Sequence, residues 1–315
     1  MSPAPGGEWE RDVLTRLAFA AVTEQRRARR WNTFFKVIIV GYLVTLLFIS
    51  LPSGWFDFGG DDKHSALVDV SGVISEQSDA SADRIVSGLR AAFEDEDTAG
   101  VILRVNSPGG SPVQAGFIYD EIRRLRKLHP KVPLYAVITD ICASGCYYIA
   151  AAADRIYADK ASVVGSIGVI MNGFGFVESM KTLGVERRAF TSGKNKALLD
   201  PFAPLREDEV QHVRGVLENI HKQFVAVVRQ GRGDRIKDDE QLFSGLIWTG
   251  EQGVALGLVD ELASAGHVAR EVIGAEKAVD FTPRKGVFER LASKIGTSIG
   301  KSFSLEAGLG QLQMR

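Results

Sequence analysis

The pattern of apolar residues begins with one uninterrupted hydrophobic run. Between Phe34 and Leu51 the only charged residue is Lys36, and the run ends at Pro52. Its length lies at the short end of the roughly 17–25 residues with which a helix crosses a lipid bilayer. We therefore expect a membrane anchor over residues 34–52. A cleaved signal peptide is the alternative, but the 33 residues that precede the run are too many for a usual signal sequence.

Charged residues are distributed unequally on the two sides of this run. Arginines precede it and aspartates follow it: Arg26, Arg27, Arg29 and Arg30 on one side, and Asp57, Asp61 and Asp62 on the other. Because positive residues tend to stay on the cytoplasmic side of a membrane, residues 1–33 are predicted to be cytoplasmic. The chain beyond a linker over residues 53–63 is then extracytoplasmic. In a bacterium this predicts a single-pass protein of the inner membrane with a periplasmic domain.

After the linker, strand-like and helix-like patterns alternate. Short apolar runs typical of strands occupy residues 66–74, 99–105, 132–138, 155–157, 165–171 and 185–190. Amphipathic spacing typical of helices covers residues 79–95, 114–128, 176–183 and 206–230, and an Ala-rich helix pattern follows Ser144. Such alternation predicts an α/β domain with parallel strands and helices on the faces of the sheet. We assign residues 64–275 to this domain. Residues 276–315 are expected to form a C-terminal tail that is either disordered or docked.

Composition and charge exclude several classes of function. The 315 residues carry 38 Lys and Arg against 39 Asp and Glu, for a net charge of −1, so nothing in the overall charge attracts nucleic acid. The two cysteines, Cys142 and Cys146, are four residues apart on the predicted helix. That spacing is poorly suited to a disulfide, and two ligands are too few for a metal site. We interpret both as small packing residues and expect no metal or nucleotide cofactor.

The residue with the most informative position is Ser144. It stands where the strand pattern of residues 132–138 turns into the Ala-rich helix. Backbone N–H groups at the start of a helix favour the negative charge that develops when an acyl carbonyl is attacked. A serine in this place is also a common helix N-cap. The neighbouring motifs decide between the two interpretations.

Three motifs carry a resemblance to a known family. They are Arg104–Ser111 with its Pro-Gly-Gly, Ala143–Tyr148 with its Ala-Ser-Gly, and Ser192–Phe202 with two lysines before a Pro-Phe pair. In this order and spacing they resemble the signal peptide peptidase A family, membrane-anchored serine/lysine proteases of the caseinolytic-protease and crotonase superfamily. The resemblance covers residues 64–274. It implies repeated β-β-α units with a mostly parallel sheet, preceded by one N-terminal transmembrane helix.

The resemblance implies that Ser144 is the nucleophile and Lys196 the general base. The family pattern places the catalytic lysine five residues before the Pro-Phe pair that begins at Pro201, which selects Lys196 over Lys194. A lysine in water is protonated at neutral pH, so a lysine that accepts a proton must be desolvated or surrounded by favourable dipoles. Apolar surroundings are therefore part of the expected mechanism.

Further site residues follow from the same resemblance. Ser166 aligns with a serine that orients the lysine amine, although a turn hydroxyl that bonds local backbone is an equally simple interpretation. The N–H groups of Gly110 and Gly145 are the candidates for an oxyanion hole. The histidines lie outside any motif, and each is predicted to be a surface residue: His64, His129, His212, His221 and His267. A Ser/His/Asp triad stays open, because it is defined by geometry rather than spacing.

The family implies a membrane-bound serine endopeptidase that cleaves remnant signal peptides in or near the lipid bilayer. It also implies a homo-oligomeric ring, in which the serine and the lysine of a site come either from one protomer or from two adjacent protomers. One alternative is a protease of the same fold that acts on another membrane protein, such as a stomatin-like partner. The other is a non-catalytic oligomeric scaffold. A crotonase-like acyl-CoA enzyme is disfavoured, because a translocated domain has no access to CoA.

Overall fold

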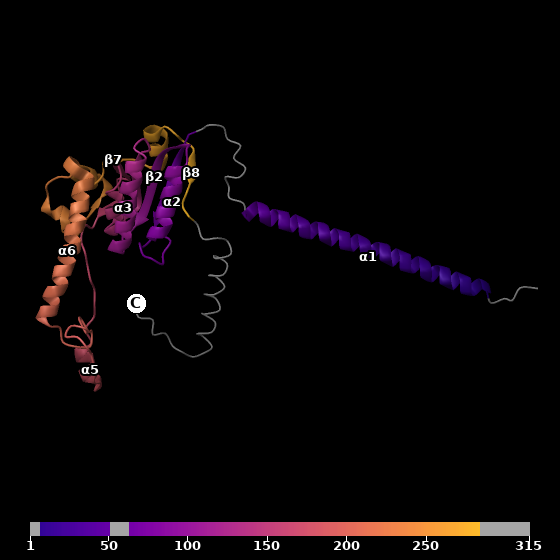
Figure 1. The fold of residues 1–315 in the computed structure, drawn as a ribbon, viewed down its shortest axis with the longest axis horizontal. Helices are drawn as coiled ribbons and strands as arrows, with labels where there is room; N and C mark the ends of the chain where they lie inside the picture. The colour runs from indigo at the N-terminus through magenta and orange to yellow at the C-terminus, as the bar shows by residue number, and fades with distance from the viewer. Residues whose placement is uncertain (1–6, 51–62, 284–315) are drawn as a thin grey trace, which may run out of the picture. The chain divides into compact units, whose positions relative to one another are not determined.

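The computed structural model describes residues 7–50 and 63–283 (Figure 1). The chain divides into two compact units, Met1–Gly60 and Asp61–Arg315. The predicted linker lies outside the described residues except for Lys63. The predicted C-terminal tail also lies outside them from residue 284 onward.

The first unit consists of one long helix, α1 (Gly7–Ser50). It begins far ahead of the predicted anchor, because the preceding segment is rich in Ala, Leu, Arg and Glu, which are strong helix formers. Its part Glu24–Leu47 is long and apolar enough to cross a membrane. Trp31 packs against Phe34 and Phe35 on this helix, with ring centroids 5.8 and 5.7 Å apart.

The second unit is an α/β domain, as the pattern predicts. Its helices are α2 (Ala82–Glu94), α3 (Pro112–Leu128), α4 (Gly145–Ala150), α5 (Val177–Leu183), α6 (Glu207–Arg232), α7 (Gly250–Leu256) and α8 (Ala265–His267), with the shorter turns η1 (Gly233–Arg235), η2 (Glu240–Phe243) and η3 (Val268–Ile273). Its strands are β1 (His64–Ser71), β2 (Thr98–Ser107), β3 (Leu134–Ala143), β4 (Arg155–Ala158), β5 (Val163–Gly165), β6 (Ile247–Thr249), β7 (Glu261–Leu262) and β8 (Ala278–Asp280).

The sheet is mostly parallel and divides at β3. Within the described residues the strand order is β6-β5-β3-β2-β1-β8, and only β5 and β6 pair antiparallel. One edge of β3 pairs with β2, while the other edge is shared by two strands: residues 135–138 pair with β4 and residues 141–143 pair with β5. The second half of β3 therefore carries a separate branch of the sheet, formed by β5 and β6, and β3 itself ends at Ala143, directly before Ser144.

The core lies between the sheet and the helices α2, α3 and α4. The stripe predicted for the first helix, Ile85, Leu89 and Phe93, is buried against β1 and β2 with at most 2% exposure. On the opposite face, a smaller cluster joins Ile102 and Val137 of the sheet to Val268 of η3. Both faces of the central strands are thus covered, as is usual for parallel sheets.

Several expectations about this domain were wrong. Residues 185–190 form no strand, because no strand within residues 63–283 pairs with them, and Phe190 is 95% exposed. Residues 278–280, expected to belong to the tail, form β8, which pairs with β1 in the sheet. His64 is buried rather than at the surface, because it begins β1 and its ring stacks on Phe281 at 5.9 Å.

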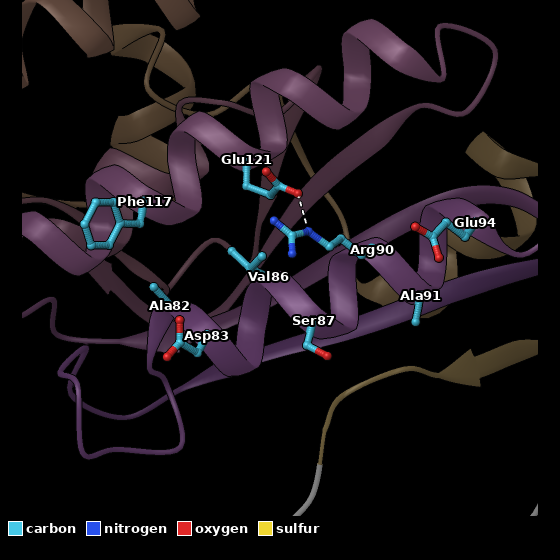
Figure 2. A pocket seen from close by; sticks show the side chains of 9 residues that line it. All are labelled: Ala82, Asp83, Val86, Ser87, Arg90, Ala91, Glu94, Phe117 and Glu121. Carbon is cyan, nitrogen blue, oxygen red and sulfur yellow. Dashed lines mark hydrogen bonds and ion pairs between the residues drawn. The ribbon is translucent and has the colours of Figure 1, made fainter.

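A hollow of about 540 Å³ lies between α2 and α3 (Figure 2). The Nε of Arg90 donates to a carboxylate oxygen of Glu121 at 2.6 Å, and Arg124 bonds the same carboxylate. The hydrogen bond from Arg124, reinforced by the one from Arg90, lowers the pKa of Glu121 to about 2, against the opposing effect of burial. These contacts join the two helices that cover the sheet.

Candidate active site

Ser144 occupies a strained position between β3 and α4. Its φ of 53° and ψ of −124° lie where residues with a Cβ are rare, and such a backbone costs about 1–3 kcal/mol. Two hydrogen bonds hold it there: its N–H donates to the carbonyl of Gly165 at 2.9 Å, and its carbonyl accepts from the N–H of Tyr148 at 3.1 Å. Strain that is retained in this way is frequent at catalytic residues. The hydroxyl thus belongs to a fixed, partly exposed turn.

The Pro-Gly-Gly loop after β2 lies directly against this turn. Gly109 and Gly110 have φ values of 101° and 149°, which favour glycine. A Cβ on Gly109 would lie 2.8 Å from the Cβ of Ser144, so the loop approaches the serine more closely than any other residue type permits. The loop is held by Ile74, whose N–H donates to Gly109 at 2.9 Å and whose carbonyl accepts from Ser111 at 2.8 Å.

The two candidate oxyanion donors are neighbours. The N atom of Gly110 lies 3.4 Å from the position that a Cβ on Gly145 would take. Among residues 7–50 and 63–283, neither the N–H of Gly110 nor that of Gly145 donates to a protein acceptor. Two free N–H groups beside a serine hydroxyl can stabilise the oxyanion of a tetrahedral acyl intermediate, where one such donor is typically worth about 2.7–4 kcal/mol.

These groups open into a pocket of about 910 Å³. One wall comes from the loops that carry Gly110, Ser144, Gly145 and Ser166. Another wall is α6, which contributes apolar and polar side chains: Leu217, Glu218, Ile220, His221, Gln223 and Phe224. The remaining lining residues are Pro108, Pro112, Tyr148, Gly168, Val169, Ile170, Phe243, Ser244 and Gly245. A pocket lined by apolar side chains together with a few polar groups is typical of a ligand-binding site.

Ser166 is in this pocket, and Lys196 is not. Ser166 also has a positive φ, 50°, and its N–H donates to the carbonyl of Leu246 at 2.7 Å, which fixes its turn beside Ser144. Lys196 is absent from the pocket lining and is exposed. It lies in a turn in which its own N–H donates to the carbonyl of Gly193 at 3.1 Å. A single chain therefore assembles the serines and glycines of the predicted site without the predicted base.

Lys196 belongs to a projecting segment, residues 170–205, which we call the arm. Figure 1 shows α5, part of the arm, beyond the end of α6 and away from the sheet. The arm contains no buried residue, yet it is rich in large apolar side chains, of which Ile170, Phe174, Leu183 and Phe190 are at least 76% exposed. It is held together by its own contacts, including the stacked rings of Phe176 and Phe202.

His221 is a pocket residue that the sequence analysis assigned to the surface. Its Nε2 lies 3.2 Å from the carbonyl oxygen of Ile167, one residue after Ser166, and the side chain contributes to the α6 wall. The signal was present in the sequence, because His221 stands four residues after Leu217 and one after Ile220, on the apolar stripe of the helix.

The two cysteines form a disulfide, contrary to the expectation that they only pack. Their Cα atoms are 5.1 Å apart. The expectation failed because it placed both residues on one helix. Cys142 instead belongs to β3, where it pairs with Ser107 and Val164, and only Cys146 belongs to α4. The sharp turn at Ser144 brings the two side chains together.

The fold and this site define a class, α/β proteins with a serine at a strand-to-helix turn beside free backbone donors. Comparison with known sequences gives the family. Residues 126–279 match peptidase family S49, a region that contains both Ser144 and Lys196. The chain belongs to this family, which confirms the resemblance.

Relatives of the chain are found in several bacteria. It is 30% identical to the "Putative signal peptide peptidase SppA" of Enterococcus faecium, over 71% of this chain and 67% of that one. It is 34% identical to "Protease 4" of Haemophilus influenzae, over 63% of this chain and 32% of that one. It is also 40% identical to a protein of Brucella abortus (strain 2308) named "Na(+)/H(+) antiporter NhaA", over 67% of this chain and 29% of that one. The match thus spans less than a third of the Brucella protein.

Proposed function

We propose that this chain is a membrane-bound serine endopeptidase that uses Ser144 as nucleophile and Lys196 as general base to cleave remnant signal peptides in or near the membrane. The observation that carries the proposal is the strained turn at Ser144, which shares a pocket with Gly110 and Gly145. The N–H groups of both glycines have no acceptor within the described part of the chain. Membership of a peptidase family makes peptide hydrolysis the reaction that fits these groups.

In the proposed mechanism, the Oγ of Ser144 attacks the scissile carbonyl while Lys196 accepts the serine proton. The N–H groups of Gly110 and Gly145 stabilise the resulting oxyanion. Lys196 then donates the proton to the leaving amine, and a water molecule hydrolyses the acyl-enzyme. Ser166 orients the lysine amine through a hydrogen bond. No metal or nucleotide takes part in these steps.

The lysine is proposed to come from an adjacent protomer of a homo-oligomeric ring. A lysine acts as a general base only in its neutral form, which desolvation favours. The arm that carries Lys196 has large apolar side chains in water, such as Phe190 at 95% exposure. Exposed apolar surface of this kind marks protein contacts. A second copy that covers the arm would bury the apolar side chains and desolvate the lysine at the same time.

Anchoring in the bacterial inner membrane, with a cytoplasmic N-terminus and a periplasmic peptidase domain, is supported by two independent features. The segment Glu24–Leu47 is long and apolar enough to span, and arginines precede its apolar part. The disulfide between Cys142 and Cys146 suits an oxidising compartment, such as the periplasm, better than the cytoplasm.

The apolar pocket favours peptide substrates with apolar side chains near the scissile bond, and remnant signal peptides are of this kind. Another membrane protein, such as a stomatin-like partner, offers similar sequences. Peptides that accumulate in cells expressing Ser144→Ala would separate the two substrates: short signal-sequence remnants support the proposal, whereas accumulation of a full-length membrane protein favours the alternative.

Labelling with a fluorophosphonate probe tests the reaction centre. We expect the full chain to be labelled at Ser144, and both Ser144→Ala and Lys196→Ala to be unlabelled, with Lys194→Ala as the matched control that keeps labelling. A non-catalytic scaffold would assemble but would not react. Labelling of Lys196→Ala at the wild-type rate would exclude this lysine as the base.

Co-expression tests whether the site is shared between protomers. Neither Ser144→Ala nor Lys196→Ala rings should cleave a peptide alone. Mixed rings place an intact serine beside an intact lysine at some boundaries and should regain part of the activity. If every mixture stays inactive while wild-type rings cleave, the two groups come from one protomer.

A further inference from the structure

The Cys142–Cys146 disulfide closes a five-residue loop with Ser144 at its middle. Both cysteines are completely buried, at 0% exposure, and neither lines the pocket. The bridge therefore does not touch a substrate in the pocket. It ties the last residues of β3 to the first turn of α4, on the two sides of the strained serine.

We propose that this disulfide is a positioning device that holds Ser144 in its reactive conformation. The inference rests on the proposed role of Ser144 as nucleophile. It assigns Cys142 and Cys146 as positioning residues, which act on the reaction only through the serine between them.

The physical argument begins with the strain at Ser144. A residue with a Cβ leaves positive φ spontaneously unless its surroundings prevent it. Two hydrogen bonds, to Gly165 and from Tyr148, restrain the peptide groups of Ser144. Both hydrogen bonds are non-covalent, and a small rotation at the start of α4 would weaken them together.

The disulfide removes that rotation. Cys142 is fixed in the sheet between Ser107 of β2 and Val164 of β5, so its position does not adapt. Cys146 lies in the first turn of α4, a helix of six residues whose body is buried in the core and held by the hydrogen bond from the Tyr147 hydroxyl to the carbonyl of Leu258 at 2.8 Å. The bridge adds a covalent tie at the end of the helix that adjoins Ser144. A covalent bond between the two fixes the start of α4, and with it the N–H of Gly145, relative to the Pro-Gly-Gly loop.

Loss of the bridge should therefore slow the chemical step more than it weakens substrate binding. With the bridge intact, Ser144 and the N–H groups of Gly110 and Gly145 stay aligned. Without it, φ of Ser144 can relax and carry the hydroxyl away from both donors. A displacement of about 1 Å at a reacting atom can cost on the order of a hundredfold in rate. We expect the labelling rate constant and kcat to fall at least tenfold, with KM changed less than threefold.

The test compares the full-length Cys142→Ala/Cys146→Ala variant with the wild type, both purified from membranes without reductant. Ile149→Val is the matched control, because it also removes buried volume from α4 but leaves the bridge intact. Rates of fluorophosphonate labelling at Ser144 are measured together with the urea midpoint of unfolding. We expect slow labelling in the double alanine variant and wild-type labelling in Ile149→Val, even where their midpoints are equally lowered.

Reduction gives a second route that requires no substitution. Dithiothreitol supplies two electrons and two protons to the Cys142–Cys146 bond, which becomes two thiols, while the reagent closes to its own cyclic disulfide. We expect the reduced wild type to label as slowly as the double alanine variant. The reagent should leave the labelling of that variant unchanged.

The outcomes separate this inference from the proposed function. If the wild type labels at Ser144 and the double alanine variant labels equally fast, the positioning role is overturned while the nucleophile stands. Two free thiols in the unfolded, unreduced wild type would overturn it as well. If the wild type does not label at Ser144 at all, the proposed function falls, and the positioning role falls with it.

Discussion

A methyl group on Gly109 would have no space, so Gly109→Ala should disable the site although no proposed catalytic residue is substituted. A Cβ there would lie 2.7 Å from the carbonyl oxygen of Ala143, 2.8 Å from the Cβ of Ser144 and 2.9 Å from the N of Gly145. None of these atoms is the flexible end of a long side chain. The clash can be relieved only if the Pro-Gly-Gly loop and the serine turn move apart.

The expected cost follows from two contributions. Gly109 has a φ of 101°, and a left-handed backbone costs a non-glycine residue about 1–2 kcal/mol. Forcing an additional methyl group into a filled space costs about 1–3 kcal/mol. We therefore expect the variant to lose about 2–5 kcal/mol of unfolding free energy. Because part of the clash is relieved by displacement of Ser144, labelling should slow on the order of a hundredfold.

Urea unfolding and the fluorophosphonate labelling rate measure the two effects on the same preparation. Gly116→Ala is the matched control, since no atom lies within 4 Å of the new Cβ in α3. In a helix that exchange stabilises by about 0.5–1 kcal/mol and should leave labelling unchanged. The reasoning is refuted if Gly109→Ala labels within threefold of the wild type.

Two charge-pair predictions concern stability. The ionised Glu121, whose folded pKa of about 2 lies below its usual 4.5, contributes stability above pH 4.5 that is lost as the pH falls toward 2. Because Arg90 and Arg124 are half exposed, solvent screens their ion pairs with Glu121. Glu121→Gln should therefore lose only about 1–2 kcal/mol of unfolding free energy at pH 7. In urea titrations the difference in unfolding free energy from the wild type should disappear by pH 2. Asp260→Asn leaves Arg232, 1% exposed, as an unpaired buried charge. It should lose about 3–5 kcal/mol of unfolding free energy, and a loss below 1 kcal/mol would contradict this.

Local patterns predict those parts of the fold in which the order of apolar and polar residues within one element decides which side chains are buried. Val101, Ile102 and Leu103 form a continuous apolar run, and all three are buried in β2. The stripe of α2 was predictable for the same reason. Ser144 was found at the end of a strand and the start of a helix, because apolar residues precede it and small residues follow it.

The parts that were missed depend on partners distant in the sequence. The end of β3 contains Thr139, Asp140 and two small residues, which do not form a strand pattern on their own. Pairing with Ser107 and Val164 imposes the strand, and this is what makes the disulfide possible. Conversely, residues 185–190 have strand-like composition but no partner strand. Local sequence does not contain the register of a sheet.

The divided edge of β3 also explains why one chain leaves the site without its proposed base. The branch formed by β5 ends at Gly165, and the turn at Ser166 brings the chain back past Ser144 before the arm begins. The arm then carries Lys196 away from the pocket, and α6, which follows the arm, forms a wall of that pocket. One chain thus supplies the nucleophile and both oxyanion donors, whereas the proposed base requires contact with a second protomer. If Lys196 acts in this way, activity requires assembly, and a variant that remains monomeric should keep its fold and its disulfide but lose labelling at Ser144.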